Sequence, residues 1–102
     1  MIHVIATIEV HQGQRGRLLD EFQELVPLVR AERGCVDYGP TIDVVTDISA
    51  QDTPRPDVVT VVEKWDSLEA LRAHLTAPHM GEFRSRVSDI VAGIRLQILE
   101  PA

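Results

Sequence analysis

Apolar and polar residues alternate along four stretches of the chain, and such alternation is typical of strands. Ile2 to Val10 alternates most regularly and places five apolar side chains on one face. Val58 to Trp65 is apolar on both faces, as expected for a strand whose two faces are covered. A weaker strand is predicted from Cys35 to about Val45, and a last strand from Ile94 to Glu100. Pro40 lies in the former and cannot donate to a ladder, which favours an edge position.

Between these stretches the apolar residues recur every three or four positions, which predicts helices. The first runs from about Gln14 to Arg33, and Gly34 ends it because glycine takes the left-handed cap without steric cost. Two shorter helices are predicted from Leu68 to Thr76 and from Pro78 to about Ala92, the latter ended by Gly93. The second half of the chain therefore carries a helix broken in two.

The order is strand, helix, strand, loop, strand, broken helix, strand. It predicts an α+β fold of the ferredoxin-like type, β-α-β-β-α-β, with a four-stranded antiparallel sheet and helices on one face. Thr46 to Asp57, rich in aspartate and proline, is the predicted loop. Helices on one face leave the other face of the two-sided strand uncovered. We therefore expect a homodimer in which a second copy covers the open sheet face.

The composition narrows the class of protein. The 102 residues suit a single domain, with 44% hydrophobic and 25% charged side chains. The net charge of −6 argues against nucleic acid and anionic membranes as partners, because both are bound through clustered lysine and arginine. Neither a membrane span nor a signal peptide is predicted. A single cysteine, Cys35, allows no internal disulfide, so we expect a cytoplasmic location.

The chain has no CxxC pair, no glycine-rich phosphate loop and no HExxH sequence. The candidates that remain are Glu63, Trp65, His74, His79, Tyr38 and Arg84. Glu63 and Trp65 are two apart on a strand and project to the same side. Glu63 either is buried with a partner or meets water at the sheet edge, and His74 is either a base or a packing residue. Pro78 separates the two histidines, so their spacing does not favour a metal site.

Several short motifs stand out along the chain. They are Glu63-Lys64-Trp65-Asp66-Ser67, Glu69-Ala70-Leu71, His74-Leu75, Pro78-His79-Met80 with Phe83, and the junction Glu32-Arg33-Gly34-Cys35 with Tyr38. Together they resemble the antibiotic biosynthesis monooxygenase (ABM) domain, nearest to its bacterial quinol monooxygenase branch. The resemblance implies a dimeric α+β barrel that oxidises quinols or similar electron-rich aromatics with O₂, without a flavin, haem or metal cofactor.

From this resemblance we expect a cofactor-independent monooxygenase whose partners are a small aromatic substrate and O₂. His74, oriented by Glu63, is the expected base for the phenolic proton. The walls of the substrate site are expected to be Trp65, Tyr38, Phe83 and Met80, with His79 and Arg84 as polar steering groups. Two alternatives stay open: a cofactor-free isomerase of a small carbonyl metabolite, and a non-catalytic dimer that binds quinones or related aromatics. Turnover without oxygen would indicate the isomerase.

Overall fold

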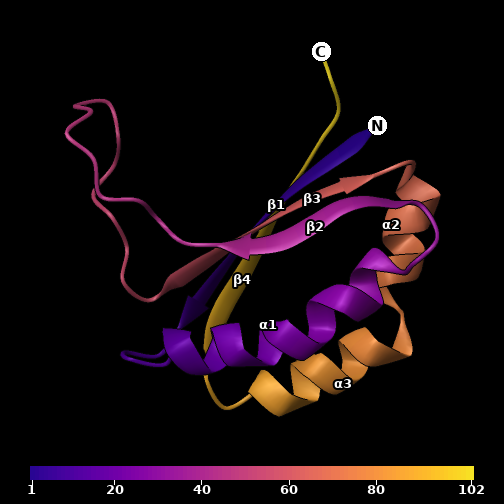
Figure 1. Ribbon diagram of the computed structural model, residues 1–102, viewed down its shortest axis with the longest axis horizontal. Coiled ribbons are helices and arrows are strands. Elements are labelled where there is room, and N and C mark those ends of the chain that lie inside the picture. Colours follow the sequence, from indigo (N-terminus) through magenta and orange to yellow (C-terminus); the bar gives the residue numbers. More distant parts are fainter.

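The computed structural model describes residues 1–102. Its elements are β1 (Ile2–Val10), α1 (Arg15–Arg30), β2 (Cys35–Thr41), β3 (Val58–Trp65), α2 (Leu68–Leu75), α3 (Pro78–Val87) and β4 (Val91–Leu99). The strands form one antiparallel sheet in the order β2-β3-β1-β4, with the helices on one side of it (Figure 1). The predicted ferredoxin-like α+β arrangement is confirmed. None of the three helices combines the length and the apolar character that a membrane span requires.

The core lies between the sheet and the helices. The predicted alternation in β1 is confirmed, since the five apolar side chains of one face are at most 9% exposed. α1 covers this face with a stripe of buried side chains, Leu18, Phe22, Leu25 and Val29. Phe22 also packs on Phe83 of α3, with ring centroids 4.9 Å apart, which joins the two helices. Burying each side chain of this size stabilises the fold by about 1.5–3 kcal/mol.

α1 ends at Arg30, three residues before the predicted end. The connection to β2 turns through Gly34, whose φ of +85° is adopted readily only by glycine. A Cβ at this position would lie 2.6 Å from the Cβ of Ala70, so the connection presses directly against α2. This close approach brings Glu32, which precedes the turn, within hydrogen-bonding distance of His74 on α2.

β2 is shorter than predicted and ends at Thr41 rather than at Val45. Residues 42–57, here called the arm, leave the sheet and project away from it (Figure 1). The base of the arm is closed by Arg55, whose backbone N–H and guanidinium both donate to the Asp43 carboxylate at 2.8–3.0 Å.

α3 ends at Val87, so the predicted helix to Ala92 is too long. The reason is a turn held by Asp89, whose two carboxylate oxygens accept hydrogen bonds from Arg17 of α1 at 2.7 and 3.2 Å. β4 starts three residues earlier than predicted as a result. Gly93 lies inside this strand, rather than ending a helix.

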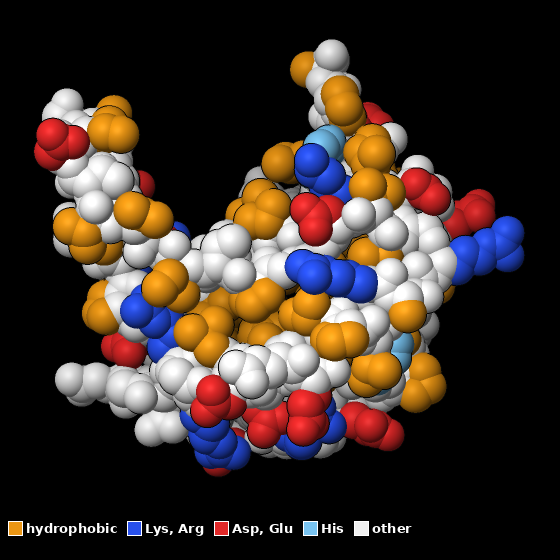
Figure 2. Space-filling view, viewed as in Figure 1, with side chains coloured by type: hydrophobic (Ala, Val, Ile, Leu, Met, Phe, Trp, Pro, Cys, Tyr) orange, Lys and Arg blue, Asp and Glu red, His pale blue; other side chains and the backbone are white.

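The helices do not cover β4, which is one of the two edge strands. Ile94, Leu96 and Ile98 pair with β1 residues of the buried face, yet they are 39–54% exposed. Apolar side chains are also exposed along the arm (Figure 2). The layer between sheet and helices is therefore open along β4, and this opening gives access to the cavity at the centre of the fold.

Candidate active site

A cavity of about 190 Å³ lies between the sheet and the helices. It is lined by Ala6, Ile8, Phe22, Tyr38, Val61, Glu63, His74, Leu75, Met80, Phe83, Arg84, Ile94 and Leu96. An apolar lining with a few polar groups is typical of small-molecule sites. Pockets for drug-sized ligands measure about 300–1,000 Å³, so this cavity suits a smaller molecule.

α2 carries His74 to the cavity. Ser67 caps the helix, since its Oγ accepts a hydrogen bond from the Ala70 N–H at 3.1 Å. His74 follows in the last turn, faces inward and is only 2% exposed. Its ring lies 4.6 Å from that of Trp65 and meets the Tyr38 ring edge-on at 5.5 Å, measured between centroids. This packing fixes the plane of the imidazole.

Glu32, in the connection between α1 and β2, binds both predicted histidines through one oxygen atom. Its Oε2 lies 2.9 Å from His74 Nδ1 and 2.7 Å from His79 Nε2. Pro78, at the first position of α3, sets the direction from which His79 approaches. An ionised carboxylate only accepts hydrogen bonds, so both nitrogens carry protons. In the neutral His74 ring the lone pair is then on Nε2.

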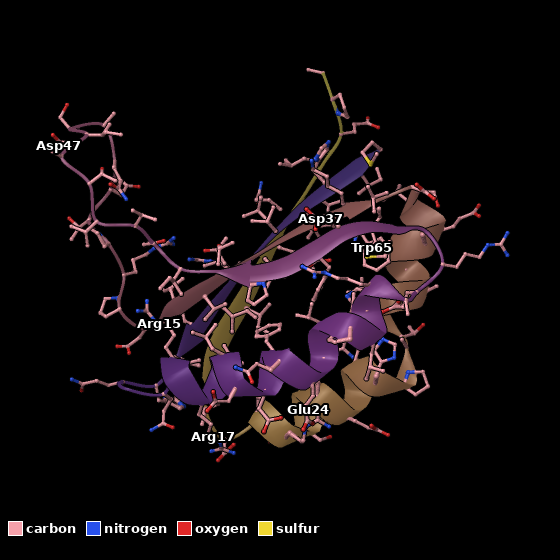
Figure 3. All side chains as sticks on the ribbon, viewed as in Figure 1. Arg15, Arg17, Glu24, Asp37, Asp47 and Trp65 are labelled. Carbon is pink, nitrogen blue, oxygen red and sulfur yellow. The ribbon has the colours of Figure 1, made fainter.

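Glu63 lies on the same side of β3 as Trp65, as predicted, and both side chains are buried. Trp65, at the α2 end of the sheet, donates from Nε1 to Glu63 Oε1 at 2.9 Å (Figure 3). His74 Nε2 lies 3.9 Å from the same oxygen, which is too far for a hydrogen bond. The expectation that Glu63 orients His74 is therefore wrong, because the hydrogen bond that orients the ring comes from Glu32.

Burial sets the protonation states in the cavity. It raises the pKa of Glu63 from 4.5 to about 7, although the hydrogen bond from Trp65 opposes this shift. It lowers the pKa of His74 below its usual 6.5, against the hydrogen bond to Glu32. Burial and the charge of Glu63 raise the pKa of Tyr38 well above 10. At neutral pH the cavity holds a neutral imidazole, a partly protonated carboxyl group and a protonated phenol.

A family model described as antibiotic biosynthesis monooxygenase matches residues 1–86. The chain belongs to the ABM family. The resemblance inferred from the short motifs is thus confirmed. A protein of Escherichia coli K12 named "Probable quinol monooxygenase YgiN" is 38% identical over 103 residues, which cover 99% of this chain and 98% of that protein.

Solved structures share the ABM fold with this chain. PA3566 from Pseudomonas aeruginosa aligns with a TM-score of 0.80 at 24% identity, over 99% of this chain and 93% of that one. A conserved protein from Methanosarcina mazei aligns with a TM-score of 0.82 at 20% identity, over 99% and 92% of the two chains. At this identity the likeness establishes the fold alone.

Six of the eight site residues predicted for this ABM protein line the cavity: Tyr38, Glu63, His74, Met80, Phe83 and Arg84. Arg84 also donates from Nη2 to the Leu75 carbonyl at 2.7 Å. Trp65 and His79 do not line the cavity, contrary to their predicted positions. Trp65 lies against His74 and Glu63, and His79 binds the same Glu32 oxygen as His74.

Glu32 was not predicted as a site residue. It is separated by 42 residues from His74 and by 47 from His79, so no local spacing pattern links them. The available signal was its place in the junction motif directly before Gly34, which the turn then brings against α2. No three His, Cys, Asp or Glu side chains are arranged to bind a metal ion.

Proposed function

We propose that this protein is a monooxygenase that oxidises a quinol or a similarly electron-rich aromatic compound with O₂, with its own side chains as the only catalytic groups. One observation carries the proposal: the buried imidazole of His74, bound at Nδ1 by Glu32, lines a small apolar cavity. The name of the 38%-identical E. coli relative supports the substrate class. Membership of the ABM family supports the reaction type.

His74 acts as the base. A quinol hydroxyl bound in the cavity gives its proton to Nε2, which leaves an imidazolium held by Glu32 and an aromatic phenolate. The phenolate is electron-rich and passes one electron directly to O₂, which gives a semiquinone and superoxide. The apolar walls exclude water and so protect both radicals until they combine.

The remaining steps balance without a further reductant. The two radicals join through a new bond between a ring carbon and oxygen, which forms a peroxide. The proton held on His74 returns to the peroxide, the O–O bond breaks as the ring carbon loses its own proton, and water leaves. A quinol and O₂ thus become a hydroxyquinone and water, with both electron pairs supplied by the quinol.

We also propose that the active form is a homodimer, joined through the open face of the sheet. Ile5 of β1 and Val62 of β3 are paired neighbours on that face, and Val62 is 37% exposed. A second sheet packed there would cover these side chains and form the dimeric α+β barrel that the family resemblance implies.

The test is oxygen uptake by protein freed of metal and flavin, given one-ring and two-ring hydroquinones and corrected for autoxidation. His74→Gln removes the base and is expected to lower the enzyme-dependent rate on the order of 100-fold, the lower end of what general-base catalysis contributes. Glu24→Gln is the matched control, because Glu24 is an exposed residue of α1. Uptake no faster than autoxidation for every substrate would contradict the proposal.

A second candidate is the cofactor-free isomerase of a small carbonyl compound. Glu63, with a pKa of about 7, faces the lone pair of His74, so the two groups can give and accept a proton across one substrate. This reaction consumes no oxygen. Turnover that persists in anaerobic buffer would favour it over the monooxygenase.

A further inference from the structure

We propose that Glu32 and His79 form a positioning pair that keeps His74 in the protonation form required for catalysis. Glu32 would hold the Nδ1 proton and stabilise the imidazolium, while His79 would hold the Glu32 carboxylate in place. The inference rests on the proposed function, in which His74 is the base. It adds two residues to that site, neither of which lines the cavity.

The first argument is the direction of the hydrogen bonds. One oxygen of Glu32 accepts from His74 at 2.9 Å and from His79 at 2.7 Å. If Glu32 served only to satisfy the buried Nδ1 of His74, the hydrogen bond between these two residues would be enough. The second donor restrains the carboxyl group itself, which is how outer residues fix the orientation of a working ligand or base.

The second argument concerns the other nitrogen of His74. No buried side-chain nitrogen or oxygen lacks a hydrogen-bond partner. His74 Nε2 makes no hydrogen bond within 3.5 Å, and its nearest carboxylate oxygen, on Glu63, is 3.9 Å away. Because every fully buried nitrogen has a partner, a nitrogen without one is not fully buried. Nε2 therefore reaches the open space of the cavity, where it meets a substrate hydroxyl. The protonated Nδ1 instead faces Glu32, away from the cavity.

The third argument is the gradient of exposure along the chain of groups. The side chains of His74, Glu32 and His79 are 2%, 13% and 23% exposed. The negative charge next to the imidazolium is thus partly shielded from water, and its attraction for the ring is stronger than at a surface. Glu32 is the group that keeps the buried His74 basic, because burial alone lowers the His74 pKa.

Other charged groups also act on the His74 ring. Glu63 on β3 approaches Nε2, and His79 and Arg84 on α3 add charges that lower the His74 pKa. Tyr38 on β2 meets the ring edge but stays protonated. Of the groups facing the ring, only Glu32 makes a hydrogen bond with it.

The test uses the Glu32→Gln variant, which keeps the size of the side chain and removes its charge. We expect kcat to fall on the order of 100-fold with KM little changed, because substrate contacts are intact while the base is weakened. NMR titration with ¹⁵N-labelled histidine should show the His74 pKa lowered relative to the wild type. The four histidines of the chain are few enough to assign. The control variant Glu24→Gln should change neither kcat nor the pKa of His74.

His79 is tested by two replacements. His79→Gln keeps a donor at a similar reach, so this variant should retain most of the wild-type kcat. His79→Leu removes the donor and should lower kcat about tenfold. Equal rates for both variants would overturn the role of His79, since a merely structural contact predicts no rescue by the donor.

The NMR readout separates this inference from the proposed function. In the wild type at neutral pH, a His74 ring protonated on Nδ1 supports the positioning pair, and a ring protonated on Nε2 overturns it. That observation needs neither a substrate nor a folded variant. If no quinol is oxidised, the proposed function fails, and the tautomer and pKa of His74 still decide whether Glu32 positions the ring. If both kcat and the His74 pKa were unchanged in Glu32→Gln, the proposal that Glu32 positions the His74 ring would be overturned.

Discussion

His74 Nε2 lies 3.9 Å from Glu63 Oε1, so a neutral imidazole and a carboxyl group with a pKa of about 7 face each other without a hydrogen bond. The gap leaves room for a substrate hydroxyl to approach the lone pair. Burial makes the ionisation of Glu63 costly in the folded state, and the His74 ring donates no hydrogen bond that would offset this cost.

We predict that Glu63→Gln stabilises the protein at alkaline pH. Burial raises the pKa of Glu63 from 4.5 to about 7, so the contribution of this group to stability is complete below pH 4.5 and is lost as the pH rises through 7. The loss is roughly 3 kcal/mol, at about 1.4 kcal/mol for each pKa unit. Glutamine does not ionise and still accepts the Trp65 hydrogen bond. Urea unfolding at pH 5 and pH 8 measures the difference in unfolding free energy between Glu63→Gln and the wild type. An equal gain in stability at both pH values would refute the raised pKa of Glu63.

We predict that Ala6→Leu blocks the cavity without harming the fold. Ala6 lies on β1 and is one of the residues that line the cavity, so a larger side chain there would extend into the cavity space. KM for a quinol should rise at least about tenfold, with little change in the melting temperature. Ala50→Leu on the exposed arm is the matched control and should alter neither value. An unchanged KM in Ala6→Leu would show that the substrate binds elsewhere.

We predict that Val62→Lys separates the proposed dimer into monomers. A lysine on the open sheet face would bury an unpaired charge between the two sheets, which costs several kcal/mol. Sedimentation velocity should show twice the chain mass for the wild type and the single chain mass for the variant. Leu28→Lys, at an exposed position on α1 on the opposite side of the sheet, should remain dimeric. A Val62→Lys variant that stays dimeric would place the interface elsewhere.

We predict that Gly34→Ala destabilises the fold by at least about 2 kcal/mol. The positive φ alone costs a non-glycine residue about 1–2 kcal/mol, and the new Cβ would clash with Ala70 at 2.6 Å. The displaced connection should also weaken the contact between Glu32 and His74, so kcat should fall. Gly16→Ala, within α1 and with open space around its Cβ, should instead stabilise by up to about 1 kcal/mol. Similar unfolding midpoints for the two variants would contradict this account.

The sequence predicted the fold well because periodicity reports which face of each element is buried. β1 and β3 begin and end as predicted, since their alternation is regular and both lie at the centre of the sheet. The ends of α1, β2 and α3 were missed. They depend on contacts between distant residues, such as the ion pairs of Arg17 with Asp89 and of Arg55 with Asp43.

The site residues that were predicted correctly differ from those that were missed in the same respect. Residues adjacent on one element, such as Glu63 and Trp65, were placed on the correct side by spacing alone. Glu32 was missed because its two partners lie on helices far along the chain. Trp65 was expected in the cavity wall, but the neighbouring Glu63 accepts its N–H and His74 covers its ring, so the indole lies outside the lining.

The arm divides the chain into two halves, and strands from the two halves alternate in the sheet. β1 belongs to the first half and lies between β3 and β4 of the second, while β2 pairs only with β3. Each half thus supplies strands that the other needs for its hydrogen bonds. A peptide-bond cut in the exposed arm should leave two fragments that stay together and reassemble from separate chains. The domain is therefore suited to fragment complementation, with the break placed far from the cavity and from His74.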